Sequence, residues 1–168
     1  MILNFCKYDN FIYFFTLNKI MKYILLCIGN RYGGDDSVGP YIADEFKKIE
    51  NEEFLIIDSG SVPENYTTVI KNKKPENLLI IDAIEMGLDP GDMRVIPREK
   101  IGVMHISTHN IPLSIFIEYI EPYAGNIVLI GIQPKRLSGK MTNPIKKSAN
   151  VLIKIIKNHQ LDKIESYQ

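Results

Sequence analysis

The sequence of 168 residues lacks several features that identify common classes of protein. It has two cysteines, Cys6 and Cys27, without Cys-x-x-Cys spacing, so a disulfide framework is not predicted and a reducing compartment, the cytoplasm, is expected. Its 20 basic residues balance 20 acidic ones, which predicts no general attraction to nucleic acid or to an anionic membrane. The longest apolar run near the N-terminus, around residues 11–17, is far shorter than the ~20 residues that span a bilayer.

Three motifs of well-known sites are also missing. Residues 28–37 read "IGNRYGGDDS", at the end of the apolar run that starts at Tyr23. This segment has neither the Gly-x-Gly-x-x-Gly spacing of a dinucleotide site nor the lysine of a P-loop. No Gly-x-Ser-x-Gly occurs, so a nucleophile-elbow serine hydrolase is not predicted. Cys27 lies inside an apolar run and is interpreted as inert core.

The first twenty residues differ from the rest of the chain. They are aromatic and apolar, yet they carry interspersed charges and no small-residue cleavage site, so a secretory signal is not expected. The sequence "MKYILLCIGN" from Met21 reads as a natural beginning, with a strand starting at once. Residues 1–20 are therefore interpreted as an extension, with a mis-assigned start as one explanation, and residues 21–168 as a single domain.

What is present is an alternation of apolar runs and amphipathic stretches. The apolar runs predict strands, and the 3.6-residue spacing between them predicts helices. Strand and helix in series indicate an α/β fold, with a mostly parallel sheet and helices on both faces. The predicted strands are residues 23–28, 54–58, 78–82, 93–96 and 127–132, and the predicted helices are 38–49, 64–73, 111–120 (capped by Thr108 or Asn110) and 142–157 (capped by Thr142, with Pro144 in its first turn).

The strand at residues 93–96 is predicted to be different from the others. Only about ten residues join it to the strand at 78–82, and a parallel partner normally needs a crossover of a dozen or more. We therefore expect a short edge strand here, antiparallel or not adjacent to its predecessor.

Two aspartates follow predicted strands. Asp36 comes after the first strand, and Asp82 ends the wholly apolar run "LLIID". Ligands of open parallel sheets bind at the carboxyl ends of the strands, and the first and third strands are usually neighbours. The simpler explanations are that Asp35 or Asp36 only caps the next helix together with Ser37, and that Asp82 only bonds turn amides.

His109, in "STHNIPLSI", opens a later predicted helix and would by itself be a structural cap. Taken together with Asp36 and Asp82, it gives one imidazole and two carboxylates at one crevice. Such a set fits a divalent metal such as zinc or nickel, with open positions, and equally fits acid–base work by coupled carboxylates. Periodicity does not choose between the two.

Five segments, in order from about residue 21 to residue 156, resemble the hydrogenase maturation endopeptidases, most closely the hydrogenase-3 (formate hydrogenlyase) type. The segments are "CIGNRYGGDDSVGP", "DSGSVPEN", "DAIEMGLDPGDMRVI", "STHNIPLSIFIEYI" and "LIGIQPKRLSGKMTNPIKKSAN". The resemblance implies a three-layer α/β/α sandwich. It also implies an endopeptidase that removes a C-terminal extension from the nickel-loaded precursor of a nickel–iron hydrogenase large subunit.

By position, the resemblance implies that Asp36, Asp82 and His109 bind the nickel of the substrate, that one carboxylate also assists hydrolysis, and that the protein needs no permanent metal. Gly33, Gly34 and Asp35 would form the surrounding substrate loop. Many relatives carry Glu where this chain has Asp36, which is one methylene shorter, so the ligand geometry can differ.

Two other functions fit parts of the sequence. A non-catalytic chaperone of the nickel-loaded large subunit would use the same three residues and differs only in not cutting. A peptidyl-tRNA hydrolase also opens with a strand and a Gly-Asn turn, but it should show an early Arg-His-Asn segment and a basic face. Here the only His-Asn is at residues 109–110, and the net charge is zero.

Overall fold

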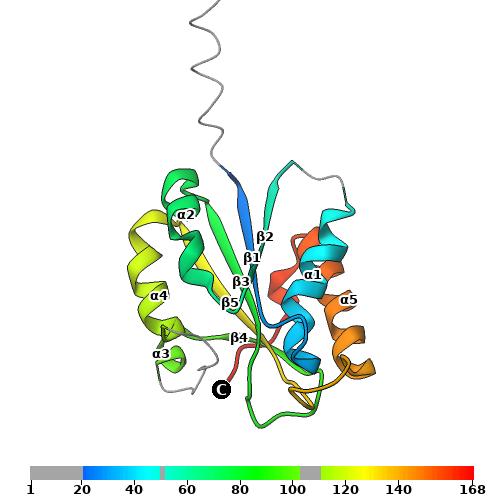
Figure 1. Cartoon of the computed structure of the whole chain (residues 1–168). Helices are drawn as coiled ribbons and strands as arrows, with labels where there is room; N and C mark the ends of the chain where they lie inside the picture. The colour runs from blue at the N-terminus through cyan, green and yellow to red at the C-terminus, as the bar shows by residue number, and fades with distance from the viewer. Residues whose placement is uncertain (1–20, 50–51, 103–110) are drawn as a thin grey trace, which may run out of the picture.

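The computed structural model describes residues 21–49, 52–102 and 111–168. The centre of this part of the chain is a five-stranded sheet with the order β2-β1-β3-β5-β4 (Figure 1). Neighbouring strands are parallel except for β4, which runs antiparallel to β5. The strands are β1 (Tyr23–Ile28), β2 (Phe54–Gly60), β3 (Asn77–Ala83), β4 (Met93–Ile96) and β5 (Asn126–Ile132).

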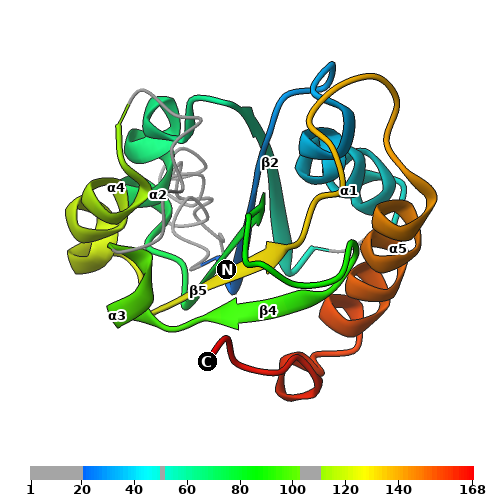
Figure 2. The same ribbon diagram turned by 90° about the horizontal axis from the view of Figure 1, so that it is seen from below.

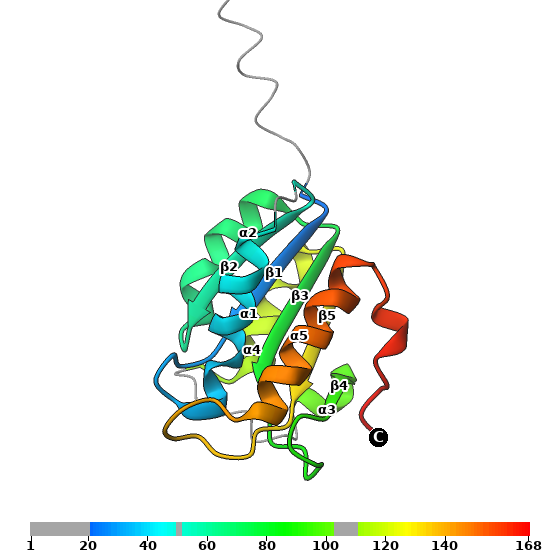
Figure 3. The same ribbon diagram turned by 90° about the vertical axis from the view of Figure 1, so that its right-hand side faces the viewer.

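Helices cover both faces of the sheet, so the predicted three-layer α/β/α sandwich is confirmed (Figures 1 and 3). Helices α1 and α5 pack on one face, and α2 and α4 pack on the other. A one-turn helix, α3, follows β4 and was not predicted. The helices are α1 (Val38–Lys47), α2 (Thr67–Lys73), α3 (Arg98–Ile101), α4 (Leu113–Ile120) and α5 (Asn143–Lys157), with 3-10 turns at Gly34–Ser37, Pro63–Tyr66, Glu121–Tyr123 and Leu161–Lys163.

The unbroken apolar runs of the central strands follow from this burial on both faces. In β1, Leu25 and Cys27 point into the core under α1 and α5, whereas Ile24 and Leu26 point into the core under α2 and α4. Successive side chains of a strand alternate between faces, so a strand covered on both sides has no position for a polar residue. Cys27 is fully buried, as predicted.

Helix α4 begins two residues later than predicted. The helix was expected from residue 111, with Thr108 or Asn110 as its cap, but it begins at Leu113 and Pro112 occupies the cap position. A residue that precedes proline is pushed away from the helical region, so Ile111 cannot open the helix. The predicted cap is therefore wrong, and residues 103–110 lie outside the described residues, as do residues 1–20.

The prediction for the edge strand is confirmed, since β4 lies at the edge of the sheet and runs antiparallel to β5. The outer side of β4 is covered by the C-terminal segment. Val95 N–H donates to the carbonyl of Glu165, and Tyr167 N–H donates to the carbonyl of Val95, both at 2.9 Å. Figure 2 shows this segment beside β4. In the described part of the chain, no helix is both long and apolar enough to cross a lipid bilayer.

Candidate functional site

Asp36 lies in the loop that follows β1, which we call the first loop (residues 29–37). The Asp36 side chain is only 7% exposed, and its Oδ2 accepts a hydrogen bond from the N–H of Asn30 at 2.8 Å. This bond directs the carboxylate toward the beginning of the first loop, and no side chain caps the N-terminus of α1. The capping role that was the simpler explanation is therefore absent, and Ser37 Oγ likewise donates to the carbonyl of Gly34.

Asp82 is the penultimate residue of β3 and lies at the carboxyl edge of the sheet. It pairs in register with Gly131 of β5 and is only 1% exposed. Its Oδ1 accepts a hydrogen bond from the N–H of Ala83 at 2.8 Å. A carboxylate buried this deeply beside apolar strands is costly unless it has partners or a function.

The fold brings Asp36 and Asp82 to one edge. β1 and β3 are adjacent parallel strands, as predicted, so the segments that follow them leave the sheet side by side. The 3-10 turn Gly34–Ser37, which carries Asp36, also contacts β3. Figure 2 shows this edge, with the first loop and the loop after β5 together beyond it.

His109 lies outside the described residues, so its place in the site stays a prediction. It precedes Leu113, the first residue of α4, by four positions, a chain length that spans at most about 14 Å. The far end of α4 leads to Asn126, which begins β5 at the amino edge, so the start of α4 points toward the carboxyl edge. Among the described residues, no three His, Cys, Asp or Glu side chains form a group that could hold a metal ion.

Asp35 is fully buried and fastens the first loop to the β5–α5 loop (residues 133–142). Its carboxylate accepts four hydrogen bonds: from the N–H groups of Lys135 (2.9 Å), Arg136 (3.0 Å) and Thr142 (2.6 Å), and from the Thr142 hydroxyl (3.1 Å). Burial by itself raises the pKa of Asp35, but these hydrogen bonds to the charged form outweigh it and hold the pKa below its usual value.

Thr142 occupies the N-cap position of α5, with proline in the first turn, as predicted, but its side chain makes no capping bond. Its hydroxyl donates to Asp35. The substrate-loop assignment of Asp35 stays a prediction. Its visible contacts are structural, because they fix the backbone on both sides of the site.

The two glycines of the first loop are required for different structural reasons. Gly34 has a φ of +63°, and a Cβ there would lie 2.6 Å from the backbone N and O of Ser138. Gly33 has an ordinary φ of −87°, but a Cβ there would lie 2.9 Å from the Cβ of Asp36. Gly34 therefore has a backbone conformation and a close neighbour that both favour glycine, whereas Gly33 leaves room for the Asp36 side chain.

Gly34→Ala is expected to lower the free energy of unfolding by about 2–4 kcal/mol. The alanine would be strained in the left-handed backbone conformation, and its Cβ would also clash with the β5–α5 loop. Gly139→Ala is the control, because Gly139 also has a positive φ (+75°) but has nothing within 4 Å of its Cβ position. Its cost should be about 1 kcal/mol from strain alone. Urea unfolding of both variants checks this, and equal losses would show that the contact with Ser138 is unimportant.

The chain is similar in sequence to known hydrogenase maturation proteases. The family model for the hydrogenase maturation protease HycI matches residues 40–159. The hydrogenase 3 maturation protease of Escherichia coli K12 is 38% identical over 135 residues, which cover 79% of this chain and 86% of that protein. The chain belongs to the hydrogenase maturation protease family.

Solved structures of similar proteins agree with this assignment. The crystal structure of a hydrogenase 3 maturation protease superposes with a TM-score of 0.82 at 33% identity, and it covers 88% of this chain and 97% of the other. The structure of HycI from Thermococcus kodakarensis KOD1 superposes with a TM-score of 0.74 at 30% identity, and it covers 86% and 98% of the two chains.

Two residues that organise the site of this maturation protease were missed from the sequence. Gln133 is only 3% exposed; its Oε1 accepts hydrogen bonds from the N–H groups of Met86 (2.7 Å) and Leu88 (3.2 Å), and its Nε2 donates to Glu85 Oε1 (2.8 Å). It thus anchors the loop that follows Asp82. A glutamine that ends an apolar strand is the signal that was available, since a buried amide needs partners.

Arg31 was also missed. Its guanidinium donates to both oxygens of Asp44 in α1 (2.6 and 2.9 Å) and to Asp58 in β2 (2.5 Å). These hydrogen bonds lower the pKa of Asp44 and fix the first loop against two neighbouring elements. No local sequence pattern indicates the ion pair between Arg31 and Asp58, because the two residues are 27 positions apart.

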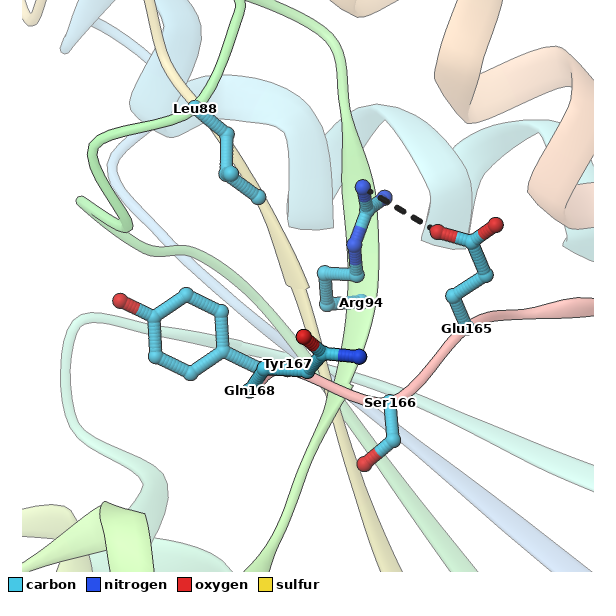
Figure 4. A pocket seen from close by; sticks show the side chains of 6 residues that line it. All are labelled: Leu88, Arg94, Glu165, Ser166, Tyr167 and Gln168. Atoms are coloured by element: carbon cyan, nitrogen blue, oxygen red, sulfur yellow. Dashed lines mark ion pairs between the residues drawn. The ribbon is translucent and has the colours of Figure 1, made fainter.

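A cleft of about 610 Å³ lies elsewhere in the protease, beside the C-terminal segment at the outer edge of β4 (Figure 4). Arg94 lies on one side of it and pairs with Glu165 at 3.3 Å. Neither Asp36 nor Asp82 lines this cleft, and its arginine already has an internal partner. It is therefore not the predicted site, which lies at the carboxyl ends of β1 and β3.

Proposed function

We propose that this protein is an endopeptidase that removes a C-terminal extension from the nickel-loaded precursor of a nickel–iron hydrogenase large subunit, and that it works in the cytoplasm. The observation that carries the proposal is the placement of Asp36 and Asp82 at one edge by two adjacent parallel strands, in a chain of the hydrogenase maturation protease family.

In the proposed mechanism, nickel arrives as part of the substrate. Asp36, Asp82 and His109 would complete its ligand shell, so that tight binding reports that the metal has been inserted. Carboxylate and imidazole groups are suitable ligands for such a borderline divalent ion. The Asn30–Asp36 hydrogen bond holds one carboxylate oxygen in place, and the other accepts no hydrogen bond from the described residues. That oxygen would bind the ion.

The chemical step would be hydrolysis of one peptide bond, with one of the two carboxylates taking the proton of the attacking water. No resident metal is part of this proposal, and a stoichiometric, tightly bound zinc in protein purified without added metal would contradict it.

The deciding experiment compares nickel-loaded and nickel-free large-subunit precursor from the same organism. Mass spectrometry should show loss of a short C-terminal peptide only from the nickel-loaded form, with substoichiometric enzyme sufficient for complete conversion. A stable complex without cleavage would instead identify a chaperone. Equal cleavage of the nickel-loaded and nickel-free forms would contradict the proposed nickel recognition but support the endopeptidase activity.

His109→Ala is expected to weaken binding of the nickel-loaded precursor at least tenfold, because one ligand of the ion is lost. Binding of the nickel-free precursor should stay within about twofold of the wild type. Isothermal titration with both forms checks this, and His159→Ala serves as a control, since His159 is exposed beside Glu53 and distant in sequence from the site. Equal losses with both precursor forms would make His109 a general contact.

A further inference from the structure

Charge is distributed unevenly along this neutral chain. Between Glu121 and Asp162 the sequence has no acidic residue, although the whole chain carries 20 acidic and 20 basic residues. The stretch contains seven Lys and Arg residues, and five of them lie in the β5–α5 loop and the first two turns of α5. We call these five the basic loop face: Lys135, Arg136, Lys140, Lys146 and Lys147.

The basic loop face lies next to the proposed site. All five side chains are exposed, and Asp35 binds the backbone of Lys135 and Arg136 directly. The β5–α5 loop therefore runs beside the first loop, which carries Asp36. Figure 3 shows α1 and α5 on the same face of the sheet, with the two loops at their lower ends.

A cleft of about 350 Å³ separates α1 from this face. Its α1 side is formed by Ser37, Pro40 and Tyr41, and its other side by Lys140, Met141 and Lys146. The Lys146 ammonium lies 5.7 Å from the centroid of the Tyr41 ring. The cleft thus combines apolar lining from Pro40 and Met141 with two cationic groups.

The positive charge of this cleft is not cancelled internally. Arg31 and Asp44 also line it and pair with each other, and Asp58, which also binds Arg31, does not line the cleft. Within the described residues, no carboxylate oxygen lies within 4 Å of the ammonium group of Lys140 or Lys146. Two lysines that line one cleft without counter-ions give it a positive potential, which attracts an anionic group.

We propose that this cleft binds a carboxylate-bearing segment of the large-subunit precursor, an inference that rests on the proposed function. The cleft has room for one or two side chains, and the hydrogen bonds of Asp35 hold its loop in place before binding, which lowers the entropic cost of association. An acidic protein segment fits better than nucleic acid, because the chain belongs to a protease family and its 20 basic and 20 acidic residues give it no general attraction to a polyphosphate.

The test uses two matched double variants. Lys140→Glu with Lys146→Glu reverses both charges of the cleft. Lys154→Glu with Lys157→Glu makes the same change in net charge about 12–17 Å farther along α5, away from the site. Both pairs are exposed, and circular dichroism should show that both variants fold.

The cleft variant should raise the KM for nickel-loaded precursor at least tenfold at 50 mM salt, with a much smaller change in kcat. The control variant should leave KM within about twofold. Wild-type KM should rise with salt, and the cleft variant should lose most of that dependence, because screened ion pairs no longer contribute. Equal KM changes in the two variants would overturn the proposal.

Two further outcomes separate the possible failures. If the wild-type protein does not cleave the precursor, the proposed function fails. The cleft is then tested by measuring the affinity of the same variants for the precursor by interferometry. Equal affinities of the cleft variant and the control variant would overturn the proposed binding site. A labelled 20-nucleotide single-stranded DNA is the second probe. Binding of that DNA at 150 mM salt, lost in the cleft variant while the KM for precursor is unchanged, would identify a nucleic-acid site and overturn the proposal.

Discussion

Asp36→Asn is expected to reduce kcat/KM for precursor processing at least about 100-fold, equivalent to about 2.7 kcal/mol of transition-state stabilisation. The change keeps the size of the side chain, and the asparagine carbonyl can still accept the hydrogen bond from Asn30 N–H. What is lost is the negative charge, which the proposed nickel contact and the proposed proton transfer both need. The fold should survive, with a melting temperature within about 2 °C of the wild type.

The matched control is Asp162→Asn, which removes one charge from an exposed residue after α5, far along the chain from the site. Steady-state cleavage of nickel-loaded precursor, read by mass spectrometry, compares the three proteins. Processing by Asp36→Asn at the wild-type rate would exclude both roles of this carboxylate. A loss of activity accompanied by unfolding would instead make Asp36 a structural residue.

Much of the fold could be predicted because the sheet is buried on both faces. Unbroken apolar runs such as "LLIID" mark strands that are covered from both sides, and each of the five predicted strands is present. The connection before β4 was too short for a parallel crossover, which correctly indicated an edge strand. The pairing of Glu165 and Tyr167 with β4 was not predicted, because it uses backbone groups that any residue possesses.

The site was predictable where a rule of topology applied. Asp36 and Asp82 each follow a strand, and parallel strands deliver such residues to one edge. Asp35 was placed with the substrate loop because its neighbours in sequence are there. Its hydrogen-bond partners are about 100 residues away, in the β5–α5 loop, and no local pattern reports contacts at that distance. The same holds for Gln133 and the loop after Asp82.

Asp35→Asn should therefore lower the free energy of unfolding by about 2–4 kcal/mol at pH 7, which is a large effect for one substitution. The carboxylate accepts four hydrogen bonds on its two oxygens, whereas an asparagine must turn its NH₂ group toward donors on one side. At least one buried N–H, that of Lys135, Arg136 or Thr142, then loses its acceptor. Urea unfolding of wild type and variant measures the difference.

The difference should depend on pH in a defined direction. The pKa of Asp35 is lower in the folded protein than in the unfolded chain, where it is about 3.9. As the pH falls, the unfolded chain takes up the proton first. The stabilisation from this carboxylate is therefore complete above that unfolded value and is lost as the pH drops through the folded one. The gap between wild type and Asp35→Asn should thus be widest near pH 7 and should narrow below about pH 4.

Asp44→Asn is the comparison that isolates burial. Arg31 lowers the pKa of Asp44 too, but the Asp44 side chain is 46% exposed, so its ion pair is screened by water and should contribute under about 1 kcal/mol. If Asp35→Asn costs no more than Asp44→Asn at pH 7, the four hydrogen bonds do not hold the two loops together. The first loop would then be free to move relative to the β5–α5 loop, and a preorganised basic cleft beside Asp36 would lose its structural basis.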